Sequence, residues 1–182
     1  MKSLAFMVRL CCLLNRFLGQ VFSWLTLGIV LVCFTVVVMR YVFSTGSVLM
    51  QDLYVWMNGV MFMGIAGYTL LRESHVRVDV FYRTAPVKRK AAVDLFGCLV
   101  FLFPFIITIS LYALPYVARS WQFMEGSSNY GGMPGLYVVK TFIIVFAVVV
   151  GIQALAMIGR SILVLSDREE LVPEDYRYGE NA

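Results

Sequence analysis

The chain has 182 residues, of which 60% are apolar and only 14% are charged, and its formal net charge is +4. Soluble domains carry roughly 25% charged residues, so a soluble protein of this length could not hide so much apolar surface. The composition therefore argues against a soluble fold, and the small positive charge is only a weak indication of nucleic-acid binding.

Four uncharged windows divide the chain, and each is close to the roughly 20 residues that a helix needs to cross a bilayer core. They predict an all-α membrane protein, because a helix satisfies its own backbone hydrogen bonds in lipid. We expect one membrane domain over residues 1–166, with four transmembrane helices at about 17–39, 53–71, 95–118 and 141–162.

A basic segment, "LAFMVRLCCLLNRFL", precedes the first span. It is either an interfacial helix or an extension of that span. A cleaved signal peptide is disfavoured, because the apolar stretch is long, begins late and ends at Arg40 without a small-residue cleavage site.

Arg40 ends the first span and Asp52 begins the second, separated by the short link "YVFSTGSVLMQ". Both charges are expected at the same membrane level. Two interpretations stand: the side chains pair, with each other or with another chain, or they are solvated separately at the interface. Trp56, with nearby Tyr41 and Tyr54, fits an aromatic belt.

The strong polar groups expected inside the spans are two amides, Asn58 and Gln153. Asn58 lies six residues after Asp52, roughly 9 Å into the membrane at 1.5 Å per residue. Such amides more often join helices than bind substrate. Gly64 lies among the small residues of the second span, which permit close helix packing.

The loop between the second and third spans has the sequence "RESHVRVDVFYRTAPVKRK". It contains six of the fifteen Lys and Arg residues of the chain. Its "VRVDVF" alternation resembles a strand, but no partner strand is evident. We expect an interfacial cytoplasmic loop that includes Arg77, with its apolar residues among the lipid headgroups. Nucleic-acid binding is disfavoured because these residues are held at the bilayer surface.

The third span contains Pro104 and Pro115, which we interpret as static bends in preference to hinges. A glycine-rich loop, "WQFMEGSSNYGGMPGLYVVK", follows, and it lacks the GK[ST] of a phosphate loop. Residues 167–182 carry six acidic residues without apolar periodicity. We predict an acidic tail that is disordered or becomes ordered on a partner.

The basic residues also predict orientation. Twelve of the fifteen Lys and Arg residues fall on the side that carries both termini and the loop after the second span. Lys and Arg mark the cytoplasmic face, so both termini are expected to be cytoplasmic.

Little in the sequence could carry chemistry. The four cysteines form no CxxC pair and His75 is the sole histidine, so a zinc site or a haem held by two histidines is not expected within the chain. The uncharged windows also lack the buried carboxylate that ion-coupled transporters usually keep. We therefore expect no enzyme activity, no metal, no cofactor and no catalytic or substrate-binding residue.

The order of several motifs resembles a known family. "RYVF" closes the first span, "QDLYVW" opens the second, "HVRVDVFY" follows it, and "SSNYGGMPGLYVVK" leads into the span with Gln153. Over about residues 15–165 this order is similar to the small membrane subunit, of the DctQ type, of tripartite ATP-independent periplasmic (TRAP) transporters. Many relatives have Glu where this chain has Asp52, so the charge is kept with a shorter reach.

The resemblance implies a small, non-catalytic permease subunit in a bacterial inner membrane. Its partners would be membrane lipids, a large permease subunit that holds the sodium and solute sites, and a periplasmic solute-binding protein that captures an organic solute, often a carboxylate. The small subunit would brace the large one and help dock the binding protein. We expect structural or interface roles, some by position in the family motifs and some from the packing argument above, for Arg40, Asp52, Trp56, Asn58, Gly64, Arg77 and Gln153.

Two rival functions remain at this point. An independent, self-dimerising four-helix transporter would need an essential membrane carboxylate, which the windows lack. A membrane enzyme or electron-transfer subunit is disfavoured by the single histidine and the absence of CxxC.

Overall fold

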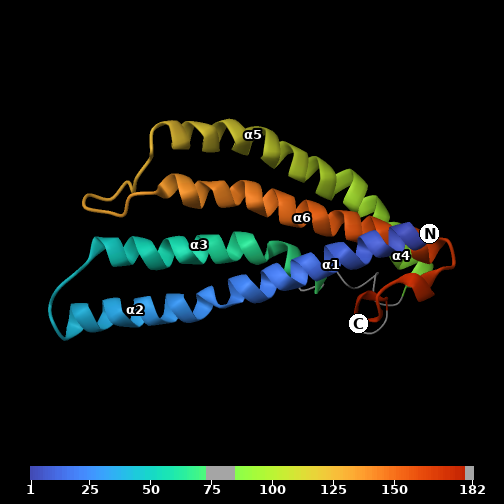
Figure 1. The fold of residues 1–182 in the computed structure, drawn as a ribbon, viewed down its shortest axis with the longest axis horizontal. Helices are drawn as coiled ribbons and strands as arrows, with labels where there is room; N and C mark the ends of the chain where they lie inside the picture. The colour runs from blue at the N-terminus through green and yellow to red at the C-terminus, as the bar shows by residue number, and fades with distance from the viewer. Residues whose placement is uncertain (73–84, 179–182) are drawn as a thin grey trace.

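The computed structural model describes residues 1–72 and 85–178, and these residues form helices joined by short connections (Figure 1). A π-helical turn, η1, joins α4 to α5, and two short 3-10 helices, η2 and η3, follow α6. The bounds are α1 Lys2–Ser23, α2 Leu25–Tyr41, α3 Val48–Leu71, α4 Val87–Gly97, η1 Cys98–Leu102, α5 Phe103–Gln122, α6 Leu136–Leu165, η2 Glu169–Leu171 and η3 Glu174–Tyr176.

Four helical stretches of the described chain are long and apolar enough to cross a membrane, which confirms the predicted fold class at this level. They are Lys2–Tyr41, Val48–Leu71, Val87–Gln122 and Leu136–Leu165. All four are longer than the predicted spans, because a helix continues past an apolar window wherever its residues still pack. The "VRVDVF" segment, His75 and Arg77 lie outside the described residues.

The first stretch is one long rod, because α1 and α2 meet at Trp24, which keeps right-handed helical angles. Its 40 residues would span about 60 Å at 1.5 Å per residue. That is about twice the thickness of a bilayer core. The basic N-terminal segment is therefore an extension of the first span, one of the two interpretations that the sequence left open.

The third stretch runs from α4 through η1 into α5 along a curved path (Figure 1). The Phe103 N–H reaches back five residues to the carbonyl of Cys98. Pro104 follows at once and has no N–H to donate, so a π-helical turn at this place accommodates the lost helical bond. Pro115 lies inside α5.

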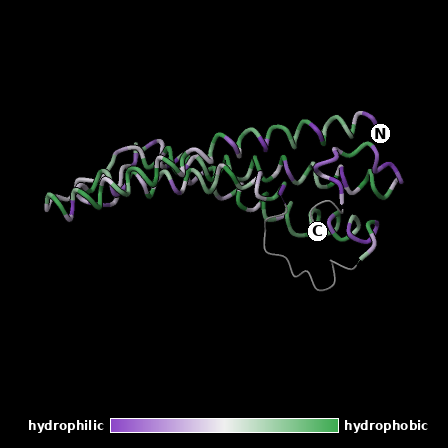
Figure 2. Tube along the Cα trace, turned by 90° about the horizontal axis from the view of Figure 1, so that it is seen from below, coloured by the Kyte–Doolittle hydropathy of each residue, from purple (hydrophilic) through white to green (hydrophobic). Residues whose placement is uncertain are grey.

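The helices form a layer whose order is α2, α3, α6 and α5 (Figure 1). Seen edge-on in Figure 2, this layer is thin where α2, α3, α5 and α6 run together, and α1 leaves it to pack on both α3 and α6. We call the end with residues 42–47 and 123–135 the loop end. The opposite end, with the N-terminus, α4 and residues 166–178, is the terminal end.

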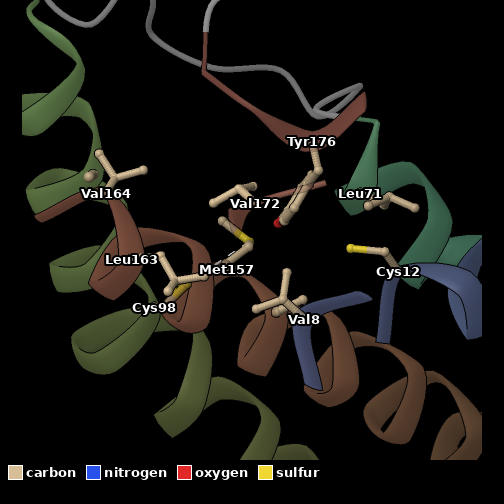
Figure 3. Close-up of a cluster of buried hydrophobic side chains, with 11 residues drawn as sticks. Val8, Cys12, Leu71, Cys98, Met157, Leu163, Val164, Val172 and Tyr176 are labelled. Carbon is tan, nitrogen blue, oxygen red and sulfur yellow. Dashed lines mark hydrogen bonds between the residues drawn. The ribbon is translucent and has the colours of Figure 1, made fainter. Parts of the chain in front are cut away.

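The buried core lies at the terminal end. Side chains from α1, α3, α6 and the residues after α6 meet there, and Tyr176 points into the cluster from the C-terminal segment (Figure 3). The α1 residues that face this core recur at helical spacing: Val8, Cys12, Asn15 and Gly19. By contrast, α2 has no buried residue. The thin half of the layer therefore exposes apolar side chains, which is acceptable in lipid or against a partner.

Candidate functional site

A buried arginine is the most unusual feature of the terminal end. Arg160 of α6 is 1% exposed, and its Nη2 donates to the Oδ2 of Asp94 in α4 at 3.0 Å. Its Nη1 donates to the backbone carbonyl of Tyr176 at 3.3 Å. The rings of Tyr176 and Tyr178 flank the guanidinium, with centroids 4.2 and 4.0 Å away. A buried charge needs such partners, because isolated burial is very costly.

Two turns earlier on the same face of α6, Gln153 continues this arrangement. Gln153 is fully buried, accepts a hydrogen bond from Asn15 Nδ2 at 3.0 Å and donates to the hydroxyl of Tyr176 at 2.9 Å. The amide thus connects α1, α6 and the C-terminal segment. We call the connected side chains the terminal network: Asn15, Asp94, Gln153, Arg160, Tyr176 and Tyr178.

The C-terminal segment, residues 166–178, closes over this network. Tyr178 donates its hydroxyl to Asp94 Oδ2 at 2.7 Å, and burial raises the pKa of the Tyr176 and Tyr178 hydroxyls well above their ordinary value. Arg16 pairs with Asp175, which fixes the segment to α1.

In the structure, residues 167–178 of the predicted acidic tail include two short 3-10 helices and pack against the helical core. Val172 and Tyr176 are buried, because the segment supplies an apolar and aromatic cover for Arg160. Residues 179–182 lie outside the described part.

At the loop end, Asp52 in the first turn and a half of α3 holds the loop before α6. Its Oδ1 accepts from Asn129 Nδ2 at 2.8 Å, its Oδ2 accepts from the Met133 N–H at 2.9 Å, and Ser127 also donates to it. A Cβ added at Gly132 would lie 2.4 Å from Asp52 Oδ2, so glycine permits this close approach.

A second contact pins the same loop to α5 and α6. Glu125 accepts from Lys140 Nζ at 2.5 Å and from the Ser120 hydroxyl at 2.6 Å. The Lys140 ammonium, followed by Ser120, holds the pKa of the Glu125 carboxyl below its ordinary value of 4.5. The ammonium also lies 4.2 Å from the centroid of the Tyr116 ring. The loop is therefore held by two carboxylates at two places.

The structure separates most of the residues singled out from the sequence. Arg40 is exposed at the end of α2, and in residues 1–72 and 85–178 no ion pair joins it to Asp52. Trp56 is half-buried and Asn58 is exposed. Gly64 is buried where α1 crosses α3, and a Cβ there would lie 2.7 Å from the ring of Phe22. Gln153 alone of this set lies in the terminal network.

Sequence reasoning missed Asn15, Asp94, Arg160 and both tyrosines of the terminal network. One signal was present: the apolar run "SILVL" continues after Arg160, so this arginine interrupts an apolar stretch and does not end it. Within the described ranges, no group of three or more His, Cys, Asp or Glu side chains could hold a metal ion. The hydrogen bonds and ion pairs described above can hold helices and connecting segments together. The carboxylates of Asp52, Asp94 and Glu125 all accept hydrogen bonds from donors of the same chain.

The Asp52 contacts lead to a first prediction. Asp52→Ala removes the acceptor for Asn129 and for the Met133 N–H, so the loop should detach from α3 while the terminal core stays intact. We expect cleavage within residues 123–135 by added protease to become several-fold faster. Tyr130→Ala, which trims a fully exposed side chain of the same loop, is the matched control. Equal cleavage rates in both variants would contradict this role of Asp52.

Comparison with known proteins identifies the family of this chain. A family model described as "Tripartite ATP-independent periplasmic transporters, DctQ component" matches residues 29–164, which is well over half of the chain. No curated protein and no solved structure matches the chain.

Proposed function

Because the chain belongs to the DctQ family of TRAP transporter components, a family of non-catalytic, multi-pass membrane subunits, we propose that it is the small permease subunit that braces a large, sodium-coupled subunit. In this proposal the transported compound is an organic solute, of the carboxylate class, that a periplasmic binding protein delivers. Membership of this family supports the two partners, the large permease subunit and the periplasmic binding protein.

The observation that carries the bracing role is the exposure of Asn58 on α3. In the described part of the chain, no hydrogen bond holds this amide, although its helix is otherwise apolar there. A primary amide left in lipid without a partner is costly. The large subunit would cover this place and hydrogen-bond the amide, and the surrounding exposed apolar side chains would pack against it.

Asp94 and Asp52 already accept hydrogen bonds from this chain, which supports placing the sodium and solute sites in the large subunit. Asp94 accepts from Arg160 and Tyr178, and Asp52 accepts from the loop before α6. An ion would have to displace these donors to bind either carboxylate. These contacts within the chain suit a rigid structural subunit better than an ion-binding one.

The distribution of basic residues supports an orientation in a bacterial inner membrane with both termini cytoplasmic. The terminal end carries Lys and Arg side chains on α1, α4 and the C-terminal segment, whereas Arg40, Arg119 and Lys140 lie toward the loop end. Cytoplasmic segments carry the excess of Lys and Arg. The loop end would then face the periplasm, where exposed Phe123 and Tyr130 could contact the binding protein.

The bracing role is tested in cells that also contain the large subunit and the binding protein. Deleting this chain should abolish solute uptake. Asn58→Leu should lower both co-purification with the large subunit and uptake several-fold, because the interface loses its amide hydrogen bond. Val55→Leu, an apolar exchange at an exposed position of the same helix, is the control.

Two results would contradict the proposal. Unchanged co-purification of the Asn58→Leu variant with the large subunit would contradict the proposed hydrogen bond between Asn58 and that subunit. Solute transport by this chain alone in liposomes would favour the independent self-dimerising transporter instead.

A further inference from the structure

We propose that a groove between α1 and the C-terminal segment binds the headgroup of one amino-phospholipid, such as phosphatidylethanolamine. The groove has a volume of about 650 Å³ and is open on one side. One wall is α1, with Phe6, Leu13 and the two arginines Arg9 and Arg16. The other wall is residues 171–175 of the C-terminal segment. This inference does not depend on the partners proposed above.

The position of the groove matches the level of lipid headgroups. Arg16 borders the uncharged window at residues 17–39, so it marks the edge of the hydrocarbon core. Beyond this edge, α1 still exposes the apolar side chains Phe6, Leu10 and Leu13. At the end of a membrane span, long basic side chains reach the headgroups while neighbouring apolar side chains contact the acyl chains. The groove therefore opens where headgroups and acyl chains meet.

The charges in the groove favour a headgroup that carries both signs. Arg16 is already paired with Asp175. Within the described residues, no ion pair or hydrogen bond engages the side chains of Arg9 and Glu174, and both are exposed. One free cation and one free carboxylate line the same groove from opposite walls. A phosphate would bind the guanidinium of Arg9, and a primary ammonium would bind Glu174.

The apolar lining completes the fit. Phe6 and Leu13 on α1, and Leu171, Val172 and Pro173 on the facing wall, offer a surface for the first part of an acyl chain. A purely anionic lipid has no ammonium to bind Glu174 and would bring a second negative charge close to this carboxylate, which disfavours phosphatidylglycerol. A choline headgroup carries the same charges but has no N–H to donate to Glu174.

Photo-crosslinking in intact membranes, with all natural partners present, tests this site. A benzophenone amino acid at Leu13 should form an adduct with phosphatidylethanolamine in preference to phosphatidylglycerol, relative to their amounts in the membrane. The same group at Leu111, an exposed position on α5, reports the lipids that merely surround the protein. Arg9→Gln or Glu174→Gln should lower the lipid adduct at Leu13 by about ten-fold, as loss of a charge-assisted hydrogen bond predicts.

Two control variants remove a charge outside the groove: Arg89→Gln on α4 and Glu170→Gln, both at exposed positions. They should leave the adduct unchanged. The exchange Arg9→Glu with Glu174→Arg keeps both charges and should restore much of the adduct. A protein adduct at Leu13, lipid proportions equal to those at Leu111, or equal yields in all variants would overturn the proposal.

Discussion

Replacing Asp94 by Leu should lower the stability of this protein more than any other single change to its polar groups. The change leaves the Arg160 guanidinium, which is 1% exposed, without its carboxylate. Breaking a buried ion pair by removing one partner costs about 3–5 kcal/mol. At roughly 2–4 °C per kcal/mol for a chain of this size, the unfolding midpoint in detergent should fall by on the order of 10 °C.

The double variant Asp94→Leu/Arg160→Met distinguishes two causes of lost stability: a buried charge without its partner, and lost packing around the side chain. Apolar replacement of both members of a buried pair is often close to neutral, so this variant should recover most of the lost stability. The control is Lys88→Met, which breaks an exposed ion pair with Asp167 at 2.7 Å and should cost at most about 1 kcal/mol. A double variant as unstable as Asp94→Leu would show that packing around Arg160, and not its charge, sets the stability.

The second large effect is expected at Gly67, where α1, α3 and α6 meet. A Cβ at this position would lie 2.4 Å from Asn15 Oδ1 and 2.7 Å from the backbone carbonyl oxygen of Val149. A backbone atom of a packed helix cannot move away without shifting the helix. Gly67→Ala should therefore cost about 1–3 kcal/mol and also disturb the Asn15–Gln153 hydrogen bond.

Two further glycines of α3 provide a graded comparison in the same thermal-unfolding measurement. At Gly59 the nearest atoms to an added Cβ are 3.8 Å away, so Gly59→Ala should leave the midpoint unchanged or raise it slightly. At Gly64 the obstacle is the Phe22 ring at 2.7 Å, a side chain that can rotate, so Gly64→Ala should fall between the other two. Equal midpoints for Gly59→Ala and Gly67→Ala would contradict the tight crossing.

The sequence identifies the type and position of several important residues, but not the residues that they contact. The sequence identifies Gly64 and Gly67 as small residues in an apolar helix. It does not show which of the two lies against a backbone carbonyl of another helix. Asp52 is recognisable as a charge at the start of a span, but its partners lie 75 to 81 residues away in the loop before α6. The choice between Arg40 and this loop as the partner of Asp52 needed the tertiary structure.

The sequence by itself determined the helical class, the four apolar stretches and the family, because membrane helices must satisfy their backbone locally and their length is set by the bilayer. The tertiary structure decided where Arg160 lies, that residues 166–178 fold back over it, and that the helices form a thin layer with Asn58 exposed. These features depend on contacts between residues far apart in the chain. Charge and hydropathy patterns indicate which segments are apolar enough to cross a membrane, whereas the partner of a buried polar group depends on how the helices pack.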